Sequence, residues 1–129
     1  MNNRQSSLID TIFSACPVRN ILARVSDKWS ILILHELRQA ASPLRFSELQ
    51  KKMPDISQHM LTQTLRTLEQ DGYVSRVVFA EVPPRVEYHI TSLGDSFMDA
   101  CRPMVDWAIA HFAEVIKNRS PYIQNADNT

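Results

Sequence analysis

The sequence predicts a mainly α-helical fold that carries one small β-hairpin, and three observations support this. Glycine occurs only twice in 129 residues, which indicates few loops that need a positive φ. Apolar residues recur at helical spacing over most of the chain, and this spacing changes to β-type patterning only over residues 74–90. Serine, proline and glycine separate the periodic segments. The expected order is helix, helix, short helix, helix, hairpin and long helix.

The N-terminal part is expected to form two helices. The segment Leu8–Phe13 has the apolar spacing of a short helix, and Cys16-Pro17 is expected to end it because the residue before a proline disfavours the α region. A second helix is expected to begin at Ser26 or Asp27, either of which is a good N-cap, and to run to Gln39. Its core-facing side chains are expected to be Trp29, Leu32, Ile33 and Leu37.

The next two predicted helices lie close together in the chain. A short helix over residues 45–53 is closed by Pro54, and a second helix covers residues 58–71. Ser57 fits the N-cap of the second helix, and Gly72 fits the position after its end. A connection of about four residues is the spacing of a helix-turn-helix. The inward-facing side chains of the second helix are expected to be Leu61, Leu65 and Leu68.

The spacing changes after Gly72. Residues 74–82 are rich in β-branched and aromatic residues, and residues 86–90 alternate between apolar and polar. Pro83-Pro84-Arg85 separates the two runs, so the sequence predicts an antiparallel hairpin with a positively charged tip. Thr91 or Ser92 is expected to cap a last helix, which Pro103 should kink. Together with the helix-turn-helix, this order predicts a winged helix-turn-helix domain.

The polar face of helix 58–71 suggests a function. Glutamine, threonine, histidine and arginine can exchange hydrogen bonds with base edges in the major groove of DNA. Any amphipathic helix has a solvated polar face, so these residues could simply be exposed to water. The preceding turn and the basic hairpin favour DNA contact. The expected DNA-binding residues are Ser57, Gln58, His59, Thr62, Gln63 and Arg66 on the helix, Arg85 on the wing, and Lys51, Lys52 and Arg76 on phosphates.

Composition excludes several other classes. Two glycines cannot form a P-loop or a dinucleotide fingerprint. The two cysteines and four histidines form no disulfide framework and show no metal-ligand spacing, so no cofactor or metal is expected. No apolar segment has the length of a membrane span or the form of a signal peptide, so we expect a cytoplasmic protein without a membrane partner. The net charge of zero predicts modest non-specific DNA affinity, without excluding a local basic face.

An ordered set of short strings resembles one family. The strings include Cys16-Pro17-Val18, Asp27-Lys28-Trp29, Arg45-Phe46-Ser47-Glu48-Leu49, Asp71-Gly72 and Val82-Pro83-Pro84-Arg85-Val86-Glu87-Tyr88. In this order they resemble the HxlR-type winged helix regulators, relatives of the MarR group, over residues 16–118. The resemblance implies a dimeric bacterial transcription regulator, with residues 57–66 reading DNA and Arg85 as the wing contact. Asp27 departs from the glycine common in the family, which affects a helix cap and not the DNA face.

The chain is expected to form one winged helix domain over residues 1–129, with a core at about 20–91. Helices over about 7–15 and 92–118 carry apolar stripes beyond this core, and a second copy of the chain is the simplest cover. Residues 119–129 are expected to form a flexible tail. A two-fold symmetric homodimer would match a palindromic operator.

Cys16 leads to the remaining hypotheses. Arg19 and Arg24 lie near it in sequence and could lower its thiol pKa, and some HxlR-type proteins are thought to sense oxidants through a cysteine at this position. Cys16 is thus a candidate redox trigger, with Cys101 of the other subunit as a candidate partner, although either could be a small buried apolar residue. A small-molecule effector at the dimer interface, a winged helix used for protein contacts and a thiol enzyme with Cys16 as nucleophile are the alternatives. No oxyanion motif or nearby histidine supports the enzyme.

Overall fold

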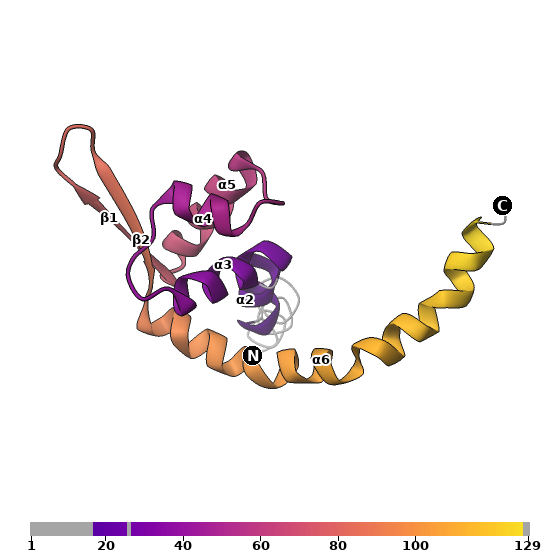
Figure 1. Cartoon of the computed structure of the whole chain (residues 1–129). Helices are drawn as coiled ribbons and strands as arrows, with labels where there is room; N and C mark the ends of the chain where they lie inside the picture. The colour runs from indigo at the N-terminus through magenta and orange to yellow at the C-terminus, as the bar shows by residue number, and fades with distance from the viewer. Residues whose placement is uncertain (1–16, 26, 128–129) are drawn as a thin grey trace, which may run out of the picture. The chain divides into compact units, whose positions relative to one another are not determined.

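The computed structural model describes residues 17–25 and 27–127 (Figure 1). The chain divides into two compact units after Met98. Within the described residues, the first unit holds four helices, a hairpin and the start of a long helix, and the second holds the rest of that helix. The elements are α2 (Pro17–Val25), α3 (Lys28–Gln39), α4 (Phe46–Lys52), α5 (Gln58–Gln70), β1 (Val74–Phe79), β2 (Arg85–Ile90) and α6 (Ser92–Asp127). No helix in the described ranges is long and apolar enough to cross a membrane.

Helices α3, α4 and α5 pack around one apolar core. The three leucines predicted to face inward from α5 are all buried, as are Ile33 and Leu37 of α3. Burying a leucine side chain stabilises the fold by roughly 1.5–3 kcal/mol, so α5 is firmly seated. Trp29 packs against this core as predicted, whereas the prediction for Leu32 is wrong because its side chain is 43% exposed. The core comprises Val25, Ile33, Leu34, Leu37, Leu44, Leu49, Met53, Ile56, Leu61, Leu65, Leu68, Tyr73, Val74 and Met98.

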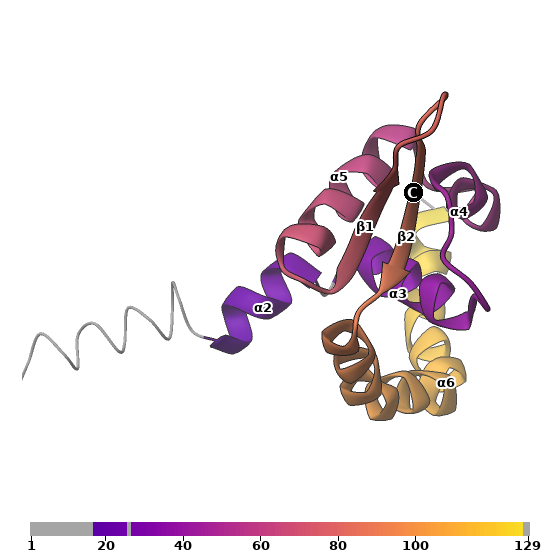
Figure 2. The ribbon, with the colours of Figure 1, turned by 90° about the vertical axis from the view of Figure 1, so that its left-hand side faces the viewer.

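The hairpin lies alongside α5 (Figure 2). Strands β1 and β2 pair antiparallel, from Val74 opposite Ile90 to Phe79 opposite Arg85. Leu44, in the loop before α4, forms an isolated β-bridge with Tyr88 through two backbone hydrogen bonds, at 2.9 and 2.7 Å. The hairpin is therefore joined to the segment that leads into the helix-turn-helix, as expected for a winged helix.

Thr91 and Gly72 connect the end of α5 to the start of α6. Gly72 has a φ of +86°, a conformation that favours glycine, and ends α5 as predicted. The Thr91 hydroxyl donates to the Gly72 carbonyl at 2.6 Å and accepts the backbone N–H of Gly94 at 3.1 Å. Thr91 thus caps α6, also as predicted.

Three element boundaries differ from the prediction. Pro17 begins α2 rather than only ending an earlier helix, because proline is favoured at the first helical position. Strand β1 ends at Phe79, earlier than residue 82, because residues 80–84 form the hairpin loop. Helix α6 continues to Asp127 where a tail was expected from residue 119, because an apolar stripe marks a packed face and not the end of backbone hydrogen bonding. The helix predicted at Leu8–Phe13 lies outside the described residues.

Candidate nucleic-acid interface

The turn between α4 and α5 is held by its own hydrogen bonds. The amide of Gln50 donates to the Ile56 carbonyl at 2.6 Å, and Ile56 itself is buried. The Ser57 hydroxyl accepts the backbone N–H of Met60 at 3.0 Å, which makes Ser57 the N-cap of α5 as predicted. The backbone N–H of Arg45 donates to Glu48 at 3.0 Å and secures the start of α4. These contacts fix the angle at which α5 is presented.

The outer face of α5 is exposed and polar. Thr62 and Arg66 lie on the side of the helix that faces the hairpin, where they line a cleft with Arg76 and Tyr88. Gln63 lies on the other side, near Asp27 of the loop before α3. The structure therefore divides the predicted reading face into two parts. The candidate residues Ser57, Gln58, His59, Thr62, Gln63 and Arg66 are all exposed.

Lys51 and Lys52 are exposed in the last turn of α4. Cations at this position interact favourably with the negative end of the helix dipole, so their placement also has a structural explanation. They lie in the helix that precedes α5, on the first part of the helix-turn-helix. A phosphate contact for them remains a prediction.

The sequence predicts Arg85 at the tip of the wing, and this prediction is wrong. It is the first residue of β2, and its guanidinium stacks on the Phe79 ring at 4.1 Å. Its Nη2 atom lies 3.4 Å from a Glu81 carboxylate oxygen, and its Nε atom lies 3.8 Å from Glu87. The register places Arg85 beside Phe79 because the loop is shifted toward residues 80–84. The charge of Arg85 is therefore already balanced within the hairpin.

Arg76 differs from Arg85 in its surroundings. It lies in the middle of β1 opposite Tyr88, and its side chain is exposed. The cleft that it lines with α5 also contains Glu69, which the sequence analysis did not select. Glu69 lies three residues after Arg66 and so shares its helix face, a signal that could have been used.

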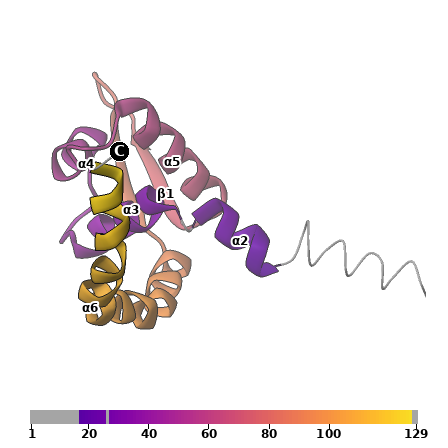
Figure 3. The same cartoon turned by 90° about the vertical axis from the view of Figure 1, so that its right-hand side faces the viewer.

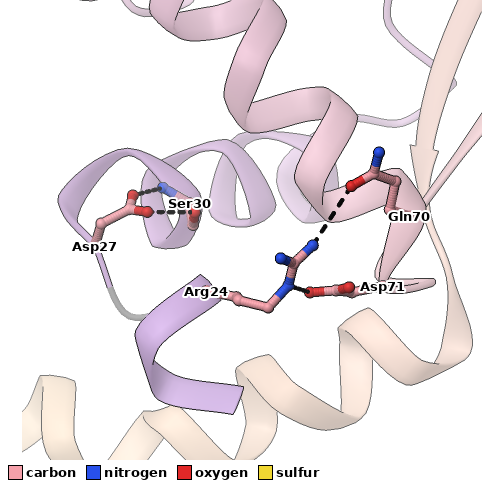
Figure 4. A network of polar contacts seen from close by, with 5 residues as sticks. All are labelled: Arg24, Asp27, Ser30, Gln70 and Asp71. Carbon is pink, nitrogen blue, oxygen red and sulfur yellow. Dashed lines mark hydrogen bonds and ion pairs between the residues drawn. The ribbon is translucent and has the colours of Figure 1, made fainter. Parts of the chain in front are cut away.

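Helix α2 is tied to the C-terminal end of α5 by Arg24 (Figures 3 and 4). The Nε atom of Arg24 donates to Asp71 at 2.6 Å, and its Nη2 atom donates to Gln70 at 3.4 Å. The hydrogen bond and the charge of Asp71 raise the pKa of Arg24 above its usual value, so its positive charge is secure. On the next helix, Asp27 caps α3 through the Ser30 backbone N–H at 2.7 Å and hydroxyl at 3.0 Å.

The two predicted redox residues differ in what can be said of them. Cys16 lies outside the described residues. Cys101 is a free, buried thiol, and burial raises its pKa, which favours the unreactive protonated form. Within residues 17–25 and 27–127, no group of three or more histidine, cysteine, aspartate or glutamate side chains could hold a metal ion.

Helix α6 of the second unit carries exposed apolar residues at helical spacing. Val105, Ile109, Phe112 and Ile116 follow the i, i+4, i+7, i+11 pattern of one face, and we call these four residues the α6 stripe. Ile109 is 72% exposed and Phe112 is 65% exposed in the single chain. Trp107 is also exposed, and its ring stacks on His111 with 4.4 Å between centroids.

Comparison with known proteins identifies similar chains. The HxlR-like helix-turn-helix family matches residues 24–116. YtfH of Escherichia coli, an HTH-type transcriptional regulator, is 39% identical over 104 residues, which cover 81% of each chain. The solved structure of the transcriptional regulator ytfH from Salmonella typhimurium is 41% identical, covers 81% of this chain and 92% of that one, and has a TM-score of 0.70.

A further solved structure is the reduced form of the regulator YodB from Bacillus subtilis. It is 35% identical, with a TM-score of 0.64, and the match covers 72% of this chain and 90% of that one. YodB is also solved after diamide treatment.

Proposed function

The chain belongs to the HxlR-like helix-turn-helix family, and we propose that it binds double-stranded DNA as a homodimer with α5 in the major groove. Like the relatives compared above, it is a helix-turn-helix transcription regulator and not an enzyme. The dimer would recognise a palindromic operator with one winged helix on each half-site. A bacterial regulator of this kind would act in the cytoplasm.

One observation carries the DNA-binding proposal. Helix α5 buries its leucines and, apart from Met60, exposes mainly hydrogen-bonding side chains, directly after a turn that a Gln50–Ile56 hydrogen bond holds. A helix used for protein contacts would be expected to show apolar residues there, because such interfaces have apolar centres. Glutamine and arginine are suited to adenine and guanine edges, respectively. We propose Gln58, His59 and Gln63 as the base-reading residues, because all three side chains are exposed and can exchange hydrogen bonds with base edges.

The homodimer is supported by the α6 stripe. Four apolar side chains on one exposed helix face would gain free energy from leaving water, at roughly 25 cal/mol per Å². A second copy can cover this face with its own identical stripe, as a two-fold axis requires. The proposed dimer thus unites two DNA-binding units.

The proposal is tested by fluorescence anisotropy with the DNA upstream of the protein's own gene, at physiological salt and with excess competitor DNA. Competitor-resistant binding is the expected result. Gln63→Ala should lower the affinity and relax base preference at one position, whereas Gln39→Ala at the end of α3 should change neither. If the protein shows no binding preference on any tested upstream DNA, the domain is used for another partner.

We also propose that an oxidant controls this binding through Cys16. The structural similarity to YodB, which is solved in reduced and diamide-treated forms, favours an oxidant over a small-molecule effector. Arg24, one of the two arginines near Cys16 in the sequence, is already paired with Asp71. Burial raises the pKa of the Cys101 thiol and so disfavours its reaction with an oxidant.

Diamide titration of the DNA complex tests the redox proposal. Wild type should change affinity on oxidation and Cys16→Ser should not, whereas Cys101→Ser shows whether Cys101 of the other subunit is the disulfide partner of Cys16. A Cys16→Ser variant that responds to diamide like wild type would contradict the proposal and assign the response to Cys101, the other cysteine of the chain.

A further inference from the structure

A polar cleft separates α5 from the wing hairpin. Thr62, Arg66 and Glu69 line it from α5, and Arg76 and Tyr88 line it from the two strands. Its volume is about 320 Å³. Ligand pockets for small organic molecules are mostly apolar, whereas four of these five side chains are charged or carry an aliphatic hydroxyl. The cleft therefore suits a charged group.

Helix and sheet geometry explain why these side chains meet. Thr62, Arg66 and Glu69 are spaced i, i+4 and i+7, which places them on one face of α5. Arg76 and Tyr88 are directly opposite each other in the hairpin and so share one face of the sheet. Helix α5 lies beside β1 (Figure 2). The side chains of the two faces therefore line the same cleft.

Both arginines that line the cleft lack an ion-pair partner. Within the described residues, neither Arg66 nor Arg76 lies within 4.0 Å of a carboxylate oxygen, although Glu69 lines the same cleft. Arg85, in contrast, is balanced by two glutamates in the same hairpin. Two uncompensated guanidinium groups on opposite walls of one cleft are an arrangement that attracts an anion.

We propose that this cleft seats one phosphate of the DNA backbone, held jointly by Arg66 and Arg76. The inference rests on the proposed function and goes beyond it, because it assigns Arg66 to a phosphate rather than to a base. With α5 in the major groove and the wing beside it, the backbone strand that borders the groove passes between the two elements. Arginine forms paired, charge-assisted hydrogen bonds with phosphate oxygens.

The other lining residues define what the cleft can offer. The Thr62 hydroxyl donates its hydrogen to the Gln58 carbonyl at 2.8 Å, so it is not free to donate to a phosphate. The Glu69 carboxylate would repel a phosphate and thereby limit its affinity. Replacing Glu69 should therefore tighten DNA binding, whereas replacing either arginine should weaken it.

The experiment combines protein variants with chemically neutral phosphates. Operator duplexes carrying one methylphosphonate at a time are titrated with wild type, Arg66→Gln, Arg76→Gln and Glu69→Gln. We expect one methylphosphonate position to weaken wild-type binding about tenfold, as the loss of a charge-assisted contact should. Each arginine variant should bind the duplex with that same methylphosphonate almost as tightly as it binds the unmodified duplex, because the contact is already lost.

Salt dependence and base preference provide two further readouts. Arg66→Gln and Arg76→Gln should each weaken binding to operator and competitor DNA by the same factor and lower the salt slope by about one. Glu69→Gln should tighten binding to both. Arg102→Gln, which alters an exposed arginine of α6, should match wild type at every step.

Several outcomes would overturn the inference. Coupling of the two arginines to different phosphates, or to none, would contradict a shared site. A change of base preference in Arg66→Gln would assign this residue to a base instead, while the proposed function would stand. If wild type bound no DNA with preference, the proposed function would fail and this inference with it.

Discussion

The described arginines differ in what already surrounds them. Arg24 is bound to Asp71 and Arg85 is stacked on Phe79, whereas Arg66 and Arg76 have no carboxylate at ion-pair distance within the described residues. The sequence identified three of the four as DNA-binding candidates from residue type and position. It could not distinguish paired from unpaired charges, because the pairs depend on the hairpin register and loop length. The observed register places Arg85 opposite Phe79 and near Glu81 and Glu87, which balance its charge.

Burial of Cys101 leads to a prediction about its reactivity. Its folded-state pKa is raised, so the protonated thiol dominates at neutral pH. The associated stability is fully present below the ordinary thiol pKa and is lost as the pH rises through the raised value. In a Cys16→Ser variant at pH 7.5, iodoacetamide should modify Cys101 at least about tenfold more slowly in the native protein than in urea. Mass spectrometry over time provides the measurement, and equal rates would show that Cys101 is accessible.

Ser57 has two candidate roles that can be separated. Ser57 is the N-cap of α5. Ser57→Ala should therefore lower the free energy of unfolding by about 1 kcal/mol and Tm by about 4 °C. Ser57→Asn should retain the stability because asparagine also caps helices. Thermal unfolding followed by circular dichroism measures the first effect, and DNA titration the second. Unchanged stability with weakened DNA binding in Ser57→Asn would assign Ser57 to the DNA as well.

A helix or strand is predicted more accurately where its segment carries several independent sequence signals. Helix α5 has a cap, a terminal glycine and inward leucines, and its predicted range of 58–71 agrees with Gln58–Gln70 within one residue. Helix α2 is not predicted from the sequence, because Pro17 after a periodic segment indicates the end of a helix, although proline also begins helices. Contacts between distant segments, such as the bridge from Leu44 to Tyr88, had no local signal at all.

The junction of α6 with the hairpin tolerates no added side chain. A Cβ atom at Gly94 would collide with the Tyr73 carbonyl and would lie 2.6 Å from the Ile90 Cγ1 atom. Because the Tyr73 carbonyl belongs to the backbone, the segment before β1 and the start of α6 would have to move apart. Gly94→Ala should therefore destabilise the protein by about 2 kcal/mol or more, measured by urea unfolding.

Ser92→Ala provides the control for the Gly94 variant, because Ser92 is exposed in the same first turn of α6. Its effect should stay within about 0.5 kcal/mol. A Gly94→Ala variant as stable as this control would mean that the start of α6 can shift without cost.

The zero net charge of the chain is compatible with the proposed DNA binding because the charges are arranged locally. The unpaired cations of α5 and β1 lie at the proposed DNA surface, while Glu81 and Glu87 neutralise the wing arginine. Few phosphate contacts imply weak non-specific binding. A single DNA-binding unit would then have limited affinity, and joining two units would supply the remainder.

Disruption of the α6 stripe tests this dependence on a second copy. The double variant Ile109→Glu and Phe112→Glu places charges at two strongly exposed apolar positions, where a dimer interface would have to bury them unpaired. We expect a folded monomer by sedimentation velocity and at least about a hundredfold loss of operator affinity, because the two half-sites would then be bound independently. Glu114→Ala is the matched control, since position 114 lies on the opposite side of α6 at 100° per residue. A double variant that stays dimeric would exclude the stripe as the interface, and a monomer with unchanged operator affinity would show that one winged helix suffices.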